Sequence, residues 1–355
     1  MKDNIKKVFQ VAVVFIGTIV GAGLASGQEI TQFFTSYGFN GFKGILICLI
    51  FYITICPLVA KISMDKGLSS YGDISKEVSP GFLGLVTEYT TNFFFVASSA
   101  IILAGSGALI HQYLGISKYI GMLIMIVLTV YTLLKDTKGL IFINSFIVPC
   151  LSITIVAIFI LYILAFGKYI NFNAISQLKP VKPMLTPIQW IISAVLYASF
   201  NITSCSGVLV PLTKEMKSRK AMYIGIIVGS VGLVALSLMI NLMLGINIPN
   251  IFKYEIPLLY IASPFGFIVQ TVLLIIIFCE MFSTEVSDIY SLAKTLEQKY
   301  NIKYKKGIFL VMLVTIPLSQ IGFKNLINIL YPAFGTLSVI FIVQCALYSF
   351  RHRKK

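Results

Sequence analysis

Ten long apolar runs separated by short polar loops dominate this chain of 355 residues and limit it to folds that a lipid bilayer accepts. A helix needs about 20 mostly apolar residues to cross the hydrocarbon core of a membrane. Inside that core, only helices and closed barrels satisfy every backbone hydrogen bond. The sequence therefore predicts an all-α integral membrane protein with a single transmembrane domain over residues 1–355. We expect about ten transmembrane helices, near residues 8–36, 41–63, 81–112, 117–134, 139–166, 187–212, 221–246, 264–295, 307–322 and 325–350.

Charged residues are sparse, and most of them lie in the loops. Only 12% of residues are charged, 57% are hydrophobic, and the mean hydropathy is +0.92. In a soluble protein, the formal net charge of +15 would suggest a nucleic-acid partner. In a multi-span protein, lysine and arginine instead collect in cytoplasmic loops. Ten spans with both termini inside leave 21 of the 28 basic residues in the cytoplasm. This predicts a multi-pass protein of a bacterial cell membrane with cytoplasmic N- and C-termini, partnered by the lipid bilayer and by no nucleic acid.

The residues that enzyme chemistry would need are few and scattered. The six cysteines lie inside apolar runs and form no C-x-x-C pair, so they indicate neither a disulfide framework nor a metal site. His111 and His352 lie near span ends without a cluster of further ligands. We therefore expect no enzyme activity and no cofactor. The basic start of the chain imitates a signal peptide, but its apolar run continues through Phe33 and is too long for one.

The first apolar run contains four glycines within eleven residues: Gly17, Gly21, Gly23 and Gly27. In a helix interior, each glycine costs about 1 kcal/mol relative to alanine. An unwound backbone survives in hydrocarbon only where protein, ions or water satisfy its polar groups. Close packing of helices through small residues is the alternative explanation. Because polar residues ending in Glu29 follow directly, we expect helix 1 to be broken here.

The sixth run carries a second set of small polar residues, between Tyr197 and Gly207. Spans one and six hold equivalent positions if the chain is a 5+5 inverted repeat of residues 8–166 and 187–350. Interrupted helices at matching positions of two repeats are the best sequence indicator of a transporter's binding site. Half-helix N-termini there attract a carboxylate, and freed carbonyls attract a cation. We therefore expect helices 1 and 6 both to be broken.

Acidic residues inside a membrane mark cavities or partners, because a charge at the bilayer centre costs at least about 2.5 kcal/mol on insertion scales. Glu29 follows the first break and is expected to line an outer gate or solute pathway. Glu280 is the deepest acidic residue, and Ser283 and Thr284 share its helix face. Their hydroxyls would suit a hard cation such as Na⁺; alternatively, they bond back to carbonyls of their own helix. The remaining acidic residues within or at the edges of spans are Glu88, Glu285 and Asp288.

Two glycine-rich segments bring a known family into view. They are Gly17-Thr-Ile-Val-Gly21-Ala-Gly23 in the first span and Tyr37-Gly38-Phe39-Asn40-Gly41 after it. The chain resembles the YkvI-type group of bacterial membrane proteins and, more distantly, the amino acid–polyamine–organocation superfamily with its leucine-transporter fold. This resemblance implies a sodium site made by the carbonyls of Gly17, Val20 and Glu280 and by the hydroxyls of Ser283 and Thr284.

The resemblance also implies a solute site between the two predicted breaks, formed by Thr18, Gly21, Gly23, Ser199, Asn201 and Thr203. The expected function is secondary active transport of an amino acid or similar small organic solute by alternating access, coupled to Na⁺. Glu280 is unusual at its position for this superfamily, which leaves H⁺ coupling as an alternative. A ligand-sensing receptor on a transporter fold, similar to germinant receptors, is the alternative function. Solute identity, transport direction and oligomeric state stay open.

Overall fold

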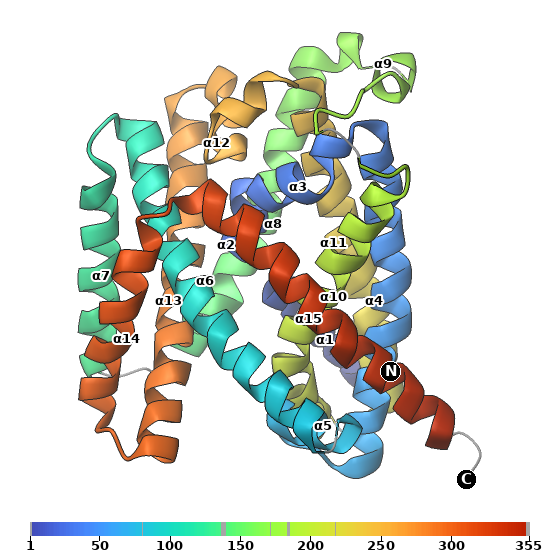
Figure 1. Ribbon diagram of the computed structural model, residues 1–355. Coiled ribbons are helices and arrows are strands. Elements are labelled where there is room, and N and C mark those ends of the chain that lie inside the picture. Colours follow the sequence, from blue (N-terminus) through green and yellow to red (C-terminus); the bar gives the residue numbers. More distant parts are fainter. Residues whose placement is uncertain are drawn as a thin grey trace.

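Helices form the regular structure throughout residues 2–79, 81–135, 140–170, 172–182, 185–216 and 218–352, which are the residues that the computed structural model describes. Long helices cross the molecule, and short helices lie mainly at its two ends (Figure 1). The long helices are α1 (Lys2–Ile19), α4 (Phe39–Lys66), α6 (Phe82–Leu114), α7 (Lys118–Lys135), α8 (Leu140–Phe166), α10 (Gln189–Met216), α11 (Arg219–Ile246), α13 (Phe267–Tyr300), α14 (Tyr304–Ser319) and α15 (Phe323–His352).

The short helices belong to the broken first span and to the loops. They are α2 (Ala22–Ser26), α3 (Gln28–Phe33), η1 (Thr35–Tyr37), α5 (Tyr71–Val78), η2 (Gly167–Tyr169), α9 (Phe172–Ser176), η3 (Asn250–Lys253), α12 (Pro257–Ala262) and η4 (Ser263–Phe265). Helix α12 contacts α2, α3 and α11, and its apolar side chains are buried. The loop before the eighth span therefore folds into a cap over the broken span, at the opposite end of the bundle from α5 (Figure 1).

Eight of the described helices are long and apolar enough to cross a membrane by length and composition: α4, α6, α7, α8, α10, α11, α13 and α15. The other two predicted spans fall outside this set for separate reasons. The first span is divided, and its α1 part carries several charges at its start. Helix α14 has 16 residues, about 24 Å at 1.5 Å per residue, although it runs beside α7 and α13 (Figure 1). Hydropathy and helix length thus support eight of the ten predicted spans.

The outer faces of the long helices are apolar, as lipid contact requires. Leu164 on α8 is 79% exposed and Leu313 on α14 is 70% exposed. A soluble protein rarely leaves so many large apolar side chains on its surface. The polar side chains instead gather inside the bundle, where α10 lies between α4 and α15 and where α6 packs against α13. The chain is therefore a multi-pass membrane protein with a polar interior.

The first predicted break is confirmed. Helix α1 ends at Ile19, and α2 starts at Ala22 after Gly21, whose backbone is extended with φ −100° and ψ −170°. The Gly21 N–H donates to the Ile19 carbonyl at 2.9 Å, whereas an unbroken helix would direct it to the carbonyl of Gly17. A second turn follows at Gly27, which lies at φ +81° between α2 and α3. The regular winding of the span is therefore lost at the glycines.

The predicted break in the sixth span is wrong, because α10 continues without interruption past Asn201. Some of the small polar residues bond within the helix or to a neighbouring helix, and none of them accompanies an unwound backbone. Ser206 Oγ donates to the Ile202 carbonyl at 2.7 Å, one turn back. Asn201 Nδ2 reaches across to the Tyr52 hydroxyl on α4 at 3.2 Å. A hydroxyl that bonds to its own helix can bend it but leaves the backbone ladder intact.

Candidate functional site

The carboxylate of Glu29 folds back over the broken span. Glu29 lies on α3 and is 3% exposed. A Cβ atom added to Gly23 on α2 would lie 2.1 Å from Glu29 Oε1, well inside van der Waals contact. Gly23 therefore provides space for this carboxylate and has no positive φ to explain it. The glycine-rich segment serves two purposes: Gly21 interrupts the helix, and Gly23 makes room for an acid beside the interruption.

Three tyrosines from three other helices surround this carboxylate. Tyr197 on α10 donates its hydroxyl to Glu29 Oε2 at 3.1 Å. Tyr331 on α15 is a second hydrogen-bonding neighbour of the same carboxyl group. Asn201 on α10 donates its amide to the hydroxyl of Tyr52 on α4 and is also a hydrogen-bonding neighbour of Tyr197. We call Tyr52, Tyr197 and Tyr331 the tyrosine cluster. Among the ion pairs of the described residues, none reaches Glu29.

A cavity of about 780 Å³ opens beside this cluster, between α5, α6, α10, α13 and α15. Its lining is mostly aromatic and hydroxyl-bearing. Phe200 on α10 forms part of the wall and stacks on Tyr331 with ring centroids 4.7 Å apart. Phe200 therefore separates the cavity from the tyrosine cluster and Glu29. The cavity wall also includes Phe94, Phe95, Thr203, Thr295 and Phe334.

The predicted solute residues do not all meet at one place. Thr203 lines the cavity, and Ser199 lies one turn away on the same face of α10 with a buried hydroxyl that has no hydrogen-bond partner in the described structure. Asn201 faces α4 instead. Thr18 donates back to the Val14 carbonyl at 2.7 Å. A Cβ on Gly21 would meet no atom within 4 Å, so the break borders open space.

The residues predicted to bind sodium lie on two parts of the bundle. Gly17 packs against α8, where an added Cβ would lie 2.9 Å from Val148 Cγ2, and this matches the packing explanation for that glycine. Glu280 and Ser283 are buried on α13, which contacts α2. Thr284 donates its hydroxyl to the Glu280 carbonyl at 3.0 Å, the back-bonded arrangement. The sodium site that also includes Val20 stays a prediction.

Several residues of the site were not singled out from the sequence. Tyr197 lies in the polar stretch of the sixth span, but Tyr52 and Tyr331 lie in ordinary apolar runs and give no local signal. From the sequence, Glu285 and Asp288 have no assigned role, although both are buried and have serine neighbours on α6. Glu88 is another acidic residue within or at the edge of a predicted span. Its side chain lies outside the part of the chain that the structure describes.

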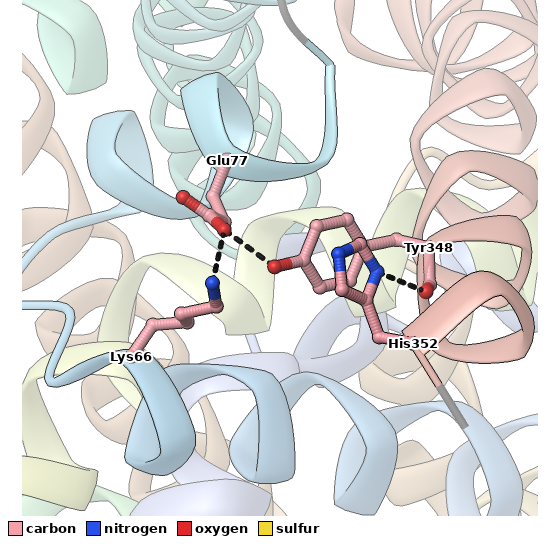
Figure 2. Close-up of polar contacts among 4 residues, drawn as sticks. All are labelled: Lys66, Glu77, Tyr348 and His352. Atoms are coloured by element: carbon pink, nitrogen blue, oxygen red, sulfur yellow. Dashed lines mark hydrogen bonds and ion pairs between the residues drawn. The ribbon is translucent and has the colours of Figure 1, made fainter. Parts of the chain in front are cut away.

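Helix α5 forms one wall of the cavity, and a polar contact fastens it between α4 and α15 (Figure 2). Lys66 Nζ lies 3.1 Å from Glu77 Oε1, and Tyr348 donates its hydroxyl to the same oxygen. His352 Nδ1 donates to the Tyr348 carbonyl at 2.9 Å. The Tyr348 hydroxyl, followed by the Lys66 ammonium, holds the pKa of Glu77 below its ordinary value of 4.5.

This contact makes a pH-dependent contribution to stability. Because the folded pKa of Glu77 is lowered, its stabilisation is complete above pH 4.5 and is lost as the pH falls through the folded value. We expect Glu77→Gln to lower the melting temperature in detergent by about 1–2 °C at pH 7 and to have little effect near pH 3. Glu297→Gln, which removes an ion pair within α13, is the matched control. An equal loss at both pH values for Glu77→Gln would contradict the assignment.

The arrangement of helices matches that of known transporters. The chain superimposes with a TM-score of 0.65 and 11% identity on Mhp1, a nucleobase-cation-symport-1 family transporter in a closed conformation with bromovinylhydantoin bound, covering 98% of this chain and 79% of Mhp1. With inward-facing Mhp1, the TM-score is 0.62 at 12% identity, and the match covers 97% of this chain and 77% of Mhp1. With MhsT in complex with L-phenylalanine, the TM-score is 0.57 at 12% identity, and the match covers 96% of this chain and 91% of MhsT. The protein therefore has the leucine-transporter fold, as the resemblance implied.

Sequence similarity identifies the family more closely. YkvI, a membrane protein of Bacillus subtilis (strain 168), is 31% identical over 94% of this chain and 93% of its own length. YyaD of the same organism is 25% identical, with 94% of each chain covered. The chain belongs to the YkvI family of membrane proteins. No protein-family model matches it.

Proposed function

We propose that this protein is a secondary active transporter for an amino acid or a similar small organic solute, and that it works by alternating access. The observation that carries the proposal is the interruption of the first membrane helix at Val20–Gly21. The Gly17 carbonyl loses the Gly21 N–H that an unbroken helix would give it. A Cβ added at Gly21 would meet open space, so the interruption borders a void. A broken membrane helix is tolerated only where protein or a water-filled cavity satisfies it, and solute sites of this fold are built at such breaks.

Access to the broken span differs between the two ends of the bundle, as expected for one state of an alternating-access transporter. At the α5 end, the cavity reaches Phe200, one aromatic layer from the tyrosine cluster. At the opposite end, α12 packs over the break, and Leu258 lies close to Gly27. A solute in the site would therefore be reached from the α5 end in this conformation. The excess of basic residues in the α5-side loops supports a cytoplasmic location for that end and for both termini.

The proposed solute site combines the backbone at Gly21 with Ser199 and Thr203 of α10. The unpartnered Ser199 hydroxyl supports this, because a buried polar atom without a partner is costly unless a ligand satisfies it. A cation held by the carbonyls of Gly17 and Val20 and the hydroxyl of Ser283 would stabilise the same break. Ion and solute would then each raise the affinity for the other. Sodium is the proposed ion at this place.

A thermal-shift screen of amino acids in Na⁺ and K⁺ buffers tests the binding part of the proposal. A solute present at 100 times its Kd stabilises the folded form by about 2.7 kcal/mol, which raises the melting temperature by about 5 °C. We expect such a shift for one class of solute, larger in Na⁺ than in K⁺. Thr203→Val should reduce the shift because it removes a hydroxyl from the cavity wall while keeping its shape.

The matched control for Thr203→Val is Thr132→Val, because Thr132 is partly exposed on α7, away from the cavity, and bonds only to its own helix among the described contacts. This control should leave the solute-induced shift unchanged. If both variants keep the full solute-induced rise in melting temperature, the solute site does not lie on α10. If the solute raises the melting temperature equally in Na⁺ and in K⁺, sodium is not the coupled ion. The proposed solute site would be unaffected by that result.

A further inference from the structure

The buried charged side chains of the described bundle are all acidic. They are Glu29 on α3 and Glu280, Glu285 and Asp288 on α13. Every described lysine, arginine and histidine is at least partly exposed. A buried charge is tolerated where a partner of opposite sign or a polar cavity compensates it. The interior of this bundle therefore favours positively charged species and disfavours anions.

Among these acids, Glu29 lies beside the interruption of the first span. Its carboxyl group fills the space that the missing side chain of Gly23 leaves. Gly21, two residues earlier, is partly exposed and borders open space. Two residues of chain span at most about 7 Å. A solute at the interruption would therefore lie within reach of the Glu29 carboxyl group.

Two tyrosine hydroxyls hold this carboxyl group in place. Tyr197 donates to Glu29 Oε2 at 3.1 Å, and Tyr331 is the second hydrogen-bonding neighbour. Hydrogen bonds donated to a carboxylate stabilise its negative charge. A tyrosine hydroxyl is itself neutral, so the negative charge is oriented but not balanced. This arrangement leaves Glu29 in need of a positively charged partner.

A basic side chain reaches α3, but it does not pair with Glu29. Lys182, in the loop before α10, hydrogen-bonds to the side-chain and backbone oxygens of Gln32. Gln32 lies three residues beyond Glu29 on α3. The ion pairs between described residues do not include Glu29. The positive charge that balances Glu29 must therefore come from a bound species.

We propose that Glu29 binds the protonated amino group of the solute. The ammonium N–H groups donate to the Glu29 carboxylate, which Tyr197 and Tyr331 keep oriented, so the pair is hydrogen-bonded as well as oppositely charged. This role of Glu29 rests on the proposed solute site at Gly21, and it narrows the solute to amines and amino acids. Organic acids and uncharged solutes would leave the buried carboxylate unbalanced.

Matched triplets of solutes test this role on the full-length wild-type protein. Each standard amino acid is compared with the amine left by removing its carboxyl group and with the acid left by removing its amino group. Leucine, 3-methylbutylamine and 4-methylpentanoate form one such triplet. In Na⁺ buffer, we expect at least one triplet in which the amino acid or the amine raises the melting temperature. The matched acid should leave the melting temperature unchanged.

Substitutions of Glu29 assign the preference to its charge. Glu29→Gln keeps the size of the side chain and removes the charge. It should raise the Kd of the ammonium compounds about 30-fold or more, the loss expected when one member of a buried charge pair is removed. Glu29→Asp keeps the charge and should still prefer the ammonium compounds to the matched acids. Glu297→Gln neutralises a partly exposed carboxyl group on α13 and, as the control, should change no Kd.

Binding and uptake are measured separately, so the role of Glu29 and the transport proposal fail in different ways. The role of Glu29 is overturned if the matched acids bind as well as the ammonium compounds, if no ammonium compound binds, or if Glu29→Gln leaves their Kd unchanged. Proteoliposome uptake of the acids would then leave transport standing without an amino group. Binding of ammonium compounds that depends on Glu29 but is followed by no uptake would support the role of Glu29 and contradict transport.

Discussion

Gly38→Ala is expected to destabilise the protein by more than about 3 kcal/mol and to prevent its recovery as a monodisperse species in detergent. Gly38 ends the broken first span at φ +60° and ψ −132°, a backbone conformation that side chains rarely adopt. An added Cβ would also lie 2.3 Å from the carbonyl oxygen of Leu178, in the loop between the fifth and sixth spans. That carbonyl accepts the Phe39 N–H at 3.0 Å, so the loop cannot move away without breaking this bond.

The matched control is Gly67→Ala. Gly67 has a similar φ of +65° at the end of α4, but an added Cβ there would meet no atom within 4 Å. This variant should cost only the backbone strain, about 1–2 kcal/mol. Melting temperatures from fluorescence-detected size-exclusion chromatography compare the two. Equal losses would show that the close approach of Leu178 has no effect, and the packing of the loop around Leu178 on this turn would then be wrong.

Gly23→Ala is expected to weaken solute binding about 10- to 100-fold while the chain still folds. The backbone at Gly23 is helical, so alanine fits it, but its Cβ would collide with the Glu29 carboxylate. Glu29 must then leave its hydrogen bond with Tyr197. Leaving a buried hydrogen-bonding partner unsatisfied beside the break costs about 1–3 kcal/mol, which matches the stated loss in affinity.

A second substitution tests whether the collision is the cause. Glu29→Asp shortens the acid by one methylene group, so the double variant with Gly23→Ala should recover part of the affinity that the single variant loses. Such a non-additive pair is expected only for residues in contact. Gly167→Ala is the control, because its Cβ would make only an ordinary contact of 3.6 Å with Ile163. If the double variant binds no better than Gly23→Ala alone, Gly23 does not act through Glu29.

The sequence predicted the helical membrane architecture and the first break because both depend on local composition. Four closely spaced glycines weaken a helix regardless of what surrounds it, and the structure ends α1 within that cluster. The sixth span misled the prediction because small polar residues have two outcomes. They can accompany an unwound backbone, or they can bond to their own helix as Ser206 does. Glycine was the better guide, and the sixth stretch contains only Gly207.

The contacts that assemble the site could not be predicted from local patterns. Asn201 and Tyr52 are 149 positions apart in sequence, and Tyr197 is 168 positions from Glu29. Tyr52 and Tyr331 do not stand out in their apolar runs, since aromatic residues are ordinary in membrane helices. The resemblance places Gly23 in the solute site, and the structure adds that the absence of a side chain at Gly23 leaves space for the Glu29 carboxyl group. Such pairings depend on how α2, α3, α4 and α10 pack together.

Gradient-driven uptake into proteoliposomes is the most direct test of a solute site at the broken first helix. The purified protein is reconstituted, and labelled amino acids are presented with an inward Na⁺ gradient, an inward H⁺ gradient or neither. We predict saturable uptake of one class of solute that a gradient accelerates, that Gly23→Ala reduces at least about tenfold, and that Gly167→Ala leaves unchanged. Folded protein that binds a solute but moves none under any gradient would contradict transport and would favour a receptor.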